Sequence, residues 1–134
     1  MTNINFYVII KWVFDRITTL LGARAMARIL IVDDETSILD LLNCFLGLSH
    51  EVKSACDAKQ ALTVLDSFPA DLAIVDTNMP GMSGAELVDV LRERGMKTVL
   101  TSGLPPVRNN ANAFVPKPFD LAFLMRTVER VLAE

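Results

Sequence analysis

The chain has 134 residues, of which 51% are hydrophobic and 22% charged, and its formal net charge is -3. This size and composition fit one compact domain with a sizeable core and leave no room for a second domain. Acidic residues outnumber basic ones and no Lys/Arg-rich block is present, so direct binding of nucleic acid is not expected.

Residues 1–27 differ in composition from the rest of the chain and form an N-terminal extension. Their apolar run, residues 6–21, is shorter than the roughly 20 residues that span a bilayer and has charges in its middle. No basic region precedes it, as one would in a secretory signal. Three interpretations stay open: an amphipathic helical extension, a membrane-surface or partner helix, or an upstream start codon before a domain that begins at Met26. We favour the last, and expect membrane contact only if residues 1–25 form a surface helix.

From Arg28 onward, short aliphatic or β-branched runs alternate with helical patterns. Four of the runs are largely apolar, as in parallel strands that are buried on both faces. The remaining run, "EVKSA", alternates and predicts an edge strand. The expected strands are residues 28–32, 51–55, 71–75, 97–101 and 113–116.

The segments between these strands show apolar residues at every third or fourth position, which predicts helices. In the first helix we expect the buried face to comprise Ile38, Leu41, Leu42 and Phe45. The third begins at the cap Ser83 and stops at Gly95, and the last opens on Asp120. Five βα units with right-handed crossovers predict a flavodoxin-like, doubly wound α/β fold, with a parallel sheet in the order 2-1-3-4-5.

Polar residues follow the strands of this predicted sheet at their carboxyl ends. In open α/β sheets ligands bind outside those ends, where the strand order reverses, so we expect these side chains to converge. They are Asp33 and Asp34 after the first strand, Asp76 after the third, Thr101 and Ser102 at the end of the fourth, and Lys117 after the fifth.

Three converging carboxylates repel one another, and a divalent cation would relieve that repulsion. Mg²⁺ binds oxygen ligands and typically uses one or two carboxylates together with a phosphate. Lys117 offers a compact positive charge for a phosphoryl oxygen, and Ser102 offers a hydroxyl hydrogen. The set predicts phosphoryl transfer onto a carboxylate nucleophile. Alternation along the strand and the following Gly103 favour Ser102 over Thr101 as the hydroxyl donor.

Four segments, "ILIVDDE", "VDTNMPGMSG", "VLTSG" and "FVPKPFD", resemble the signature segments of the response-regulator receiver family. The resemblance covers residues 28–134 and implies a receiver domain there. It implies that Asp76 is the phosphoacceptor, that Mg²⁺ is held by Asp33, Asp34, Asp76 and the backbone carbonyl of Asn78, and that Ser102 and Lys117 contact the phosphoryl group. Ser102 and the aromatic Phe114 would form the switch, and the Lys117–Pro118 peptide would be cis.

The sequence departs from the family between Ser102 and Phe114. A full helix is usual there, but "GLPPVRNNANA" permits about one helical turn. We therefore expect a shortened or missing fourth helix.

As a member of such a family, the chain would be a cytoplasmic signalling protein rather than an enzyme. It would accelerate its own phosphorylation and dephosphorylation. Its phosphoryl donor would be a histidine kinase or a histidine phosphotransfer protein. With no output domain after Glu134, it would act on an unknown downstream protein.

Two alternatives remain. A haloacid-dehalogenase-type phosphatase also uses an aspartate nucleophile with Mg²⁺, but it needs an acid two residues later, where this chain has Asn78. A pseudo-receiver would bind partners without phosphorylation, against which the complete set of polar positions argues.

Three further side chains are assigned no chemical role. Cys44 and Cys56 have no CxxC spacing and are expected to be reduced, buried thiols. His50 is the only histidine, and its place at a loop-to-strand junction favours an exposed position.

Overall fold

Five parallel strands form a single sheet in the order β2-β1-β3-β4-β5 in the computed structural model, which describes residues 6–20, 26–105 and 108–134. The predicted flavodoxin-like doubly wound order is confirmed. The third and fourth strands each end one residue later than predicted, on Asp76 and Ser102. The strands are β1 (Arg28–Val32), β2 (Glu51–Ala55), β3 (Leu72–Asp76), β4 (Lys97–Ser102) and β5 (Ala113–Pro116).

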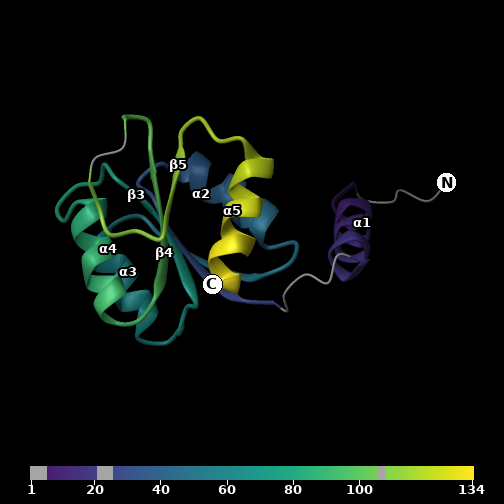
Figure 1. Ribbon diagram of the computed structural model, residues 1–134, viewed down its shortest axis with the longest axis horizontal. Coiled ribbons are helices and arrows are strands. Elements are labelled where there is room, and N and C mark those ends of the chain that lie inside the picture. Colours follow the sequence, from purple (N-terminus) through teal and green to yellow (C-terminus); the bar gives the residue numbers. More distant parts are fainter. Residues whose placement is uncertain (1–5, 21–25, 106–107) are drawn as a thin grey trace.

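Helices cover both faces of the sheet (Figure 1). On one face, α2 (Thr36–Leu46) and α5 (Leu121–Ala133) enclose a core built around Ile29, Ile31 and Ile74. On the other, α3 (Ala58–Leu65) and α4 (Gly84–Glu93) enclose the alternate strand residues. The strands are therefore buried on both sides, as continuous apolar runs predict.

A further helix, α1 (Phe6–Leu20), stands apart from the sheet and its covering helices (Figure 1). The Lys11 Nζ donates a hydrogen bond to the carbonyl oxygen of Leu48 at 2.9 Å, just beyond α2. None of the helices in the described residues is long and apolar enough to cross a membrane.

Local signals fix where the other helices begin and end. Ser83 Oγ accepts the Glu86 N–H at 3.2 Å, and Asp120 Oδ1 accepts the Phe123 N–H at 3.1 Å, as predicted for N-terminal caps. Gly95, with φ +80°, follows α4 in the left-handed conformation that favours glycine.

The buried face of α2 is rotated from the predicted one. The side chains buried in the core are Leu39, Leu42 and Leu46, whereas Ile38 and Leu41 are only half-buried. The prediction was right for Leu42 and wrong for Ile38 and Leu41, which line a cavity at the carboxyl edge of the sheet. Ile38 also packs against the edge of the core.

His50 is buried, contrary to the prediction. Its Nδ1 accepts the Ala27 N–H at 3.1 Å, and its Nε2 lies 2.8 Å from Glu129 Oε1. Because Nδ1 accepts a hydrogen bond, the ring proton sits on Nε2 and is donated to the carboxylate. The imidazole thus links the residue before β1 to α5, a long-range contact that the local sequence does not indicate.

The predicted burial of the two cysteines was also wrong. Cys44 and Cys56 are free thiols, as expected, but both are exposed. Cys44 lies on the outer face of α2, and Cys56 follows the last residue of β2, so neither reaches the core.

No helix lies between β4 and β5 in the described residues 103–105 and 108–112. This confirms the prediction that the helix expected between the fourth and fifth strands is curtailed. Asparagines anchor this segment instead. Asn112 Oδ1 accepts hydrogen bonds from the Thr98 N–H at 2.9 Å and from Arg92 Nη1 at 2.8 Å. Asn110 Nδ2 donates to Asp89 Oδ1 at 2.8 Å. Polar side chains therefore attach the segment to β4 and α4.

Asn112→Ala should lower the free energy of unfolding by about 1–2 kcal/mol, because it leaves the Thr98 N–H without its side-chain acceptor. Asn112→Asp keeps the acceptor oxygen and should retain most of the stability. Urea denaturation would measure both. An alanine variant as stable as wild type would show that the segment is held in another way.

Candidate functional site

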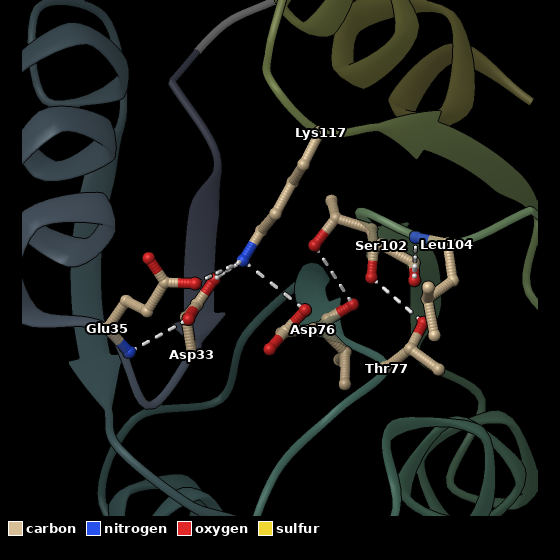
Figure 2. A network of polar contacts seen from close by, with 9 residues as sticks. Asp33, Glu35, Asp76, Thr77, Ser102, Leu104 and Lys117 are labelled. Carbon is tan, nitrogen blue, oxygen red and sulfur yellow. Dashed lines mark hydrogen bonds and ion pairs between the residues drawn. The ribbon is translucent and has the colours of Figure 1, made fainter.

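The carboxyl ends of β1, β3 and β5 bring three charged side chains together, as predicted. The Lys117 Nζ lies 2.7 Å from Asp33 Oδ2 and 3.3 Å from Asp76 Oδ1 (Figure 2). Both carboxylates are nearly buried, with 2% of Asp33 and 5% of Asp76 exposed. A single ammonium group therefore bridges two acids that water scarcely reaches.

Backbone hydrogen bonds fix this arrangement. Asp33 Oδ1 accepts the Glu35 N–H at 2.9 Å, and the Asp33 N–H donates to the carbonyl of Ala55 at 3.1 Å. The Lys117 N–H donates to the carbonyl of Ser102 at 2.8 Å, and the Lys117–Pro118 peptide is cis, as expected. The lysine is thus held by the end of β4 while its side chain extends across to β1 and β3.

Burial raises the pKa of the Asp76 carboxyl above its ordinary value of 3.8, and the charge of Asp33 raises it further. The charge and hydrogen bond of Lys117 act in the opposite sense without cancelling the rise. Burial also works to lower the pKa of Lys117, but the hydrogen bond and charge of Asp33, aided by Asp76, outweigh it and raise that pKa. Lys117 is therefore firmly cationic, and a negative charge on Asp76 is costly.

Asp76→Asn should raise the free energy of unfolding of the metal-free protein at neutral pH by about 1 kcal/mol. The pKa of Asp76 is higher in the folded than in the unfolded chain, so wild-type stability falls as pH rises through the folded value. The advantage of the variant should therefore shrink on acidification and vanish below the ordinary pKa of 3.8. Urea denaturation over a pH series measures it. A variant less stable than wild type at neutral pH would mean that the attraction to Lys117 dominates.

The donor atoms at this edge suit a hard divalent cation. Carboxylate oxygens of Asp33, Asp34 and Glu35 all lie within 4.8 Å of one another. The adjoining cavity is lined by Asp34, Asp76 and Asn78, among others. An all-oxygen, anionic set of this kind fits Mg²⁺. Glu35 was not among the predicted ligands, although it directly follows the acidic pair, and its carboxylate also lies 3.6 Å from Lys117 Nζ.

The two hydroxyl residues at the end of β4 differ in their contacts. Thr101 is the register partner of Asp76, and its Oγ1 donates to the carbonyl of Val75 at 3.4 Å. Ser102 Oγ instead accepts the Leu104 N–H at 3.0 Å (Figure 2). In the described residues Ser102 makes no direct hydrogen bond to Asp76. Its hydroxyl proton is not used by the contact to Leu104, whereas that of Thr101 is donated to Val75.

Phe114 lies beside Ser102 and is half-buried. Together with Leu100, Leu104 and Pro105 it lines a small pocket that also reaches Thr77, Asn78 and Ser102. Leu104 and Asn78 also line the cavity beside Asp76, so these two residues adjoin both the acidic site and the pocket of Phe114. The predicted switch residues are therefore neighbours, on the side of β4 away from α5.

Gly84 is a site residue that the sequence reasoning missed. A Cβ at this position would lie 2.1 Å from the carbonyl oxygen of Asp76 and 2.7 Å from the Cα of Thr77. The Gly84 N–H also donates to the carbonyl of Thr77 at 3.0 Å. Only glycine allows α4 to begin directly against the backbone of Asp76. The sequence does contain a signal for this role, because a glycine directly after the predicted cap Ser83 allows the start of a helix to approach another backbone closely.

Gly84→Ala should cost about 2–3 kcal/mol of folding free energy, because the new methyl group meets backbone atoms that cannot rotate away. Gly103→Ala is a matched control, since a Cβ there would meet nothing within 4 Å. Thermal unfolding of the two variants gives the comparison. Equal stabilities would show that α4 shifts freely and does not fix the position of Asp76.

The comparisons with known proteins agree with this geometry. Residues 29–129 match the response regulator receiver domain model. The chain belongs to the response regulator receiver family, a class of signalling domains in two-component systems.

Among its relatives, the response regulator protein PilR of Pseudomonas aeruginosa is 32% identical over 115 residues, which are 78% of this chain and 26% of PilR. The chain spans between about a quarter and a half of the curated relatives it matches. A CheY-like receiver domain protein from Methanospirillum hungatei is 30% identical with a TM-score of 0.75, covering 81% of this chain and 95% of that one. TrrA of Thermotoga maritima, solved in complex with Mg²⁺-BeF, is 32% identical with a TM-score of 0.72, covering 79% and 99%.

Proposed function

We propose that this chain is the phosphoacceptor of a two-component phosphorelay and that Asp76 receives the phosphoryl group. The donor is a histidine kinase or a histidine phosphotransfer protein. The observation that carries the proposal is the Lys117 ammonium, 3.3 Å from Asp76 and 2.7 Å from Asp33 at the open edge of the sheet. The similarity to TrrA, whose structure holds Mg²⁺ with a beryllofluoride group, supports the same chemistry here.

Asp33, Asp34, Asp76 and the backbone carbonyl of Asn78 are the proposed holders of Mg²⁺. When bound, the ion neutralises the clustered acids and the charge that develops on the phosphoryl oxygens. Asp33 and Asp76 are already positioned through Lys117, and Asp34 lies on the cavity wall with Asn78.

The reaction requires a carboxylate oxygen of Asp76 to attack phosphorus in line with the leaving group. A phosphorus–oxygen bond forms, the bond from phosphorus to the donor's imidazole nitrogen breaks, and that nitrogen keeps the electron pair. Lys117 then pairs with a phosphoryl oxygen, and Ser102 donates its free hydroxyl proton to another. Hydrolysis by water regenerates Asp76 and releases inorganic phosphate.

The two alternatives are weaker. A dehalogenase-type phosphatase would need a carboxylate two residues after the nucleophile, and Asn78 stands there. A pseudo-receiver would have no use for the buried, charged arrangement of Asp33, Asp76 and Lys117, which is costly to keep without a function.

The receiver domain comprises residues 28–134, and residues 1–27 are an addition to it. Its location is the cytoplasm, where histidine kinases expose their phosphorylated domains.

Output passes to a downstream protein without direct DNA contact. Ser102 draws Phe114 with it through the intervening segment. Since that segment lacks a helix in the described residues, phosphorylation should drive little dimerisation through this face.

Acetyl phosphate with Mg²⁺ should add one phosphoryl group to the intact protein, detected by mass spectrometry, and Asp76→Asn should abolish the addition. Chelation of Mg²⁺ should abolish it as well. Phosphate found on another residue while Asp76 stays unmodified would refute the assignment.

Ser102→Ala should slow loading by about 10- to 150-fold, the effect of losing a hydrogen bond of about 1.5–3 kcal/mol to a charged group. Thr101→Val is the matched control, because its hydroxyl proton is already donated to Val75 and should contribute little. Loading rates with acetyl phosphate decide between them. A larger effect for Thr101→Val would transfer the role to Thr101.

A further inference from the structure

The α1 helix carries most of the exposed apolar surface in the described part of the chain. Among those residues, six of the nine exposed large hydrophobic side chains belong to α1: Phe6, Tyr7, Val8, Ile9, Trp12 and Val13. We call these six the α1 apolar surface. Phe6 is 74% exposed and Trp12 is 59% exposed. Large apolar side chains left exposed together on one short helix mark an interaction site.

Charge is divided unevenly between α1 with its flanks and the receiver. Of the chain's 13 basic and 16 acidic residues, three basic and one acidic lie in residues 1–27, so this part is cationic and the rest is acidic. Within α1, the guanidinium of Arg16 lies 4.8 Å from the ring centroid of Trp12. Aromatic side chains paired with basic ones are typical of helices that lie in the interface of a lipid bilayer.

The receiver carries few fully exposed large hydrophobic side chains among its described residues. Outside α1, the exposed large hydrophobics are Met26, Leu104 and Phe123, which belong to three separate segments. In a second copy, the largest exposed apolar surface would again be α1, and fifteen residues form about two heptads, which is short for a stable helix pair.

A helix of this length cannot reach across a bilayer. Fifteen residues of α-helix extend about 22 Å, against a hydrocarbon thickness of about 30 Å. Lys11 meanwhile attaches the helix to the receiver through the Leu48 carbonyl. A helix in contact with lipid would therefore lie in the plane of the surface, with the receiver beside it.

We propose that α1 binds the surface of an anionic lipid bilayer through the α1 apolar surface, with Arg16 near the headgroups. This selects the membrane-surface helix from the interpretations that the sequence leaves open. The site does not involve Asp76, so the proposal stands or falls independently of phosphorylation.

Trp12 is the only tryptophan of the chain and reports directly on α1. The full chain should co-sediment with vesicles of phosphatidylcholine and phosphatidylglycerol, and Trp12 emission should shift to shorter wavelength. Binding to pure phosphatidylcholine vesicles should be weaker. Arg16→Gln should reduce binding to the mixed vesicles about fivefold, the effect of one basic side chain at an anionic surface.

The double variant Phe6→Glu, Ile9→Glu should reduce binding at least about tenfold while leaving Trp12 in place as the probe. Phe123→Glu, which changes an exposed phenylalanine of α5, should bind like wild type. Circular dichroism would show whether the variants keep their helices.

Three results would overturn the proposal. The first is a chain that stays in the supernatant with unchanged Trp12 emission. The second is binding that Phe123→Glu weakens as much as the double variant does. The third is a dimer, seen by light scattering and lost in the double variant, in a chain that does not bind vesicles. That last result would identify a second copy as the occupant of α1.

Discussion

The ammonium group of Lys117 lies among three carboxylates, and the rest of the site depends on this contact. It is 2.7 Å from Asp33, 3.3 Å from Asp76 and 3.6 Å from Glu35. One positive charge cannot neutralise this many acids, so the site retains an excess of negative charge. Burial is the larger cause that makes ionised Asp76 costly, and this excess of negative charge adds to it. A divalent cation would relieve the excess. The buried part of the arrangement is possible only because β1, β3 and β5 end at the same edge of the sheet.

Much of the fold and the acidic part of the site could be predicted from the sequence, because both depend on short-range patterns. Apolar runs located the strands to within one residue at their ends. Because the carboxyl ends of parallel strands lie at the same edge of the sheet, an acid or a lysine that follows a strand must lie at that edge. Ser83 and Asp120 capped their helices as expected.

What could not be predicted depends on contacts between distant segments. His50 is buried because α5 supplies Glu129, which is 79 residues away. The role of Gly84 depends on how closely α4 approaches the Asp76 carbonyl. The side chain of Asn112 holds the segment between β4 and β5 in place through hydrogen bonds to residues of β4 and α4. Local composition indicated that the helix between β4 and β5 was curtailed. It did not indicate which contacts hold the segment that replaces this helix.

The curtailed segment also changes how a phosphoryl signal would leave the site. The Ser102 hydroxyl oxygen accepts a hydrogen bond from the Leu104 N–H, and Leu104 lines both the acidic cavity and the pocket of Phe114. A shift of the Ser102 hydroxyl toward a phosphoryl group would therefore act first on Leu104 and then on Phe114. Under the proposed function, a switch of this kind would move a short loop, and its readout would be a local surface.

The central claim is that burial and the charge of Asp33 set the ionisation of Asp76 against the attraction of Lys117. Titration of the Asp76 carboxyl carbon by ¹³C NMR in the metal-free protein tests it directly. The account predicts a pKa above the ordinary 3.8, lowered in Asp33→Asn, where the repelling charge is gone. A wild-type pKa at or below 3.8, or one that Asp33→Asn leaves unchanged, would contradict it.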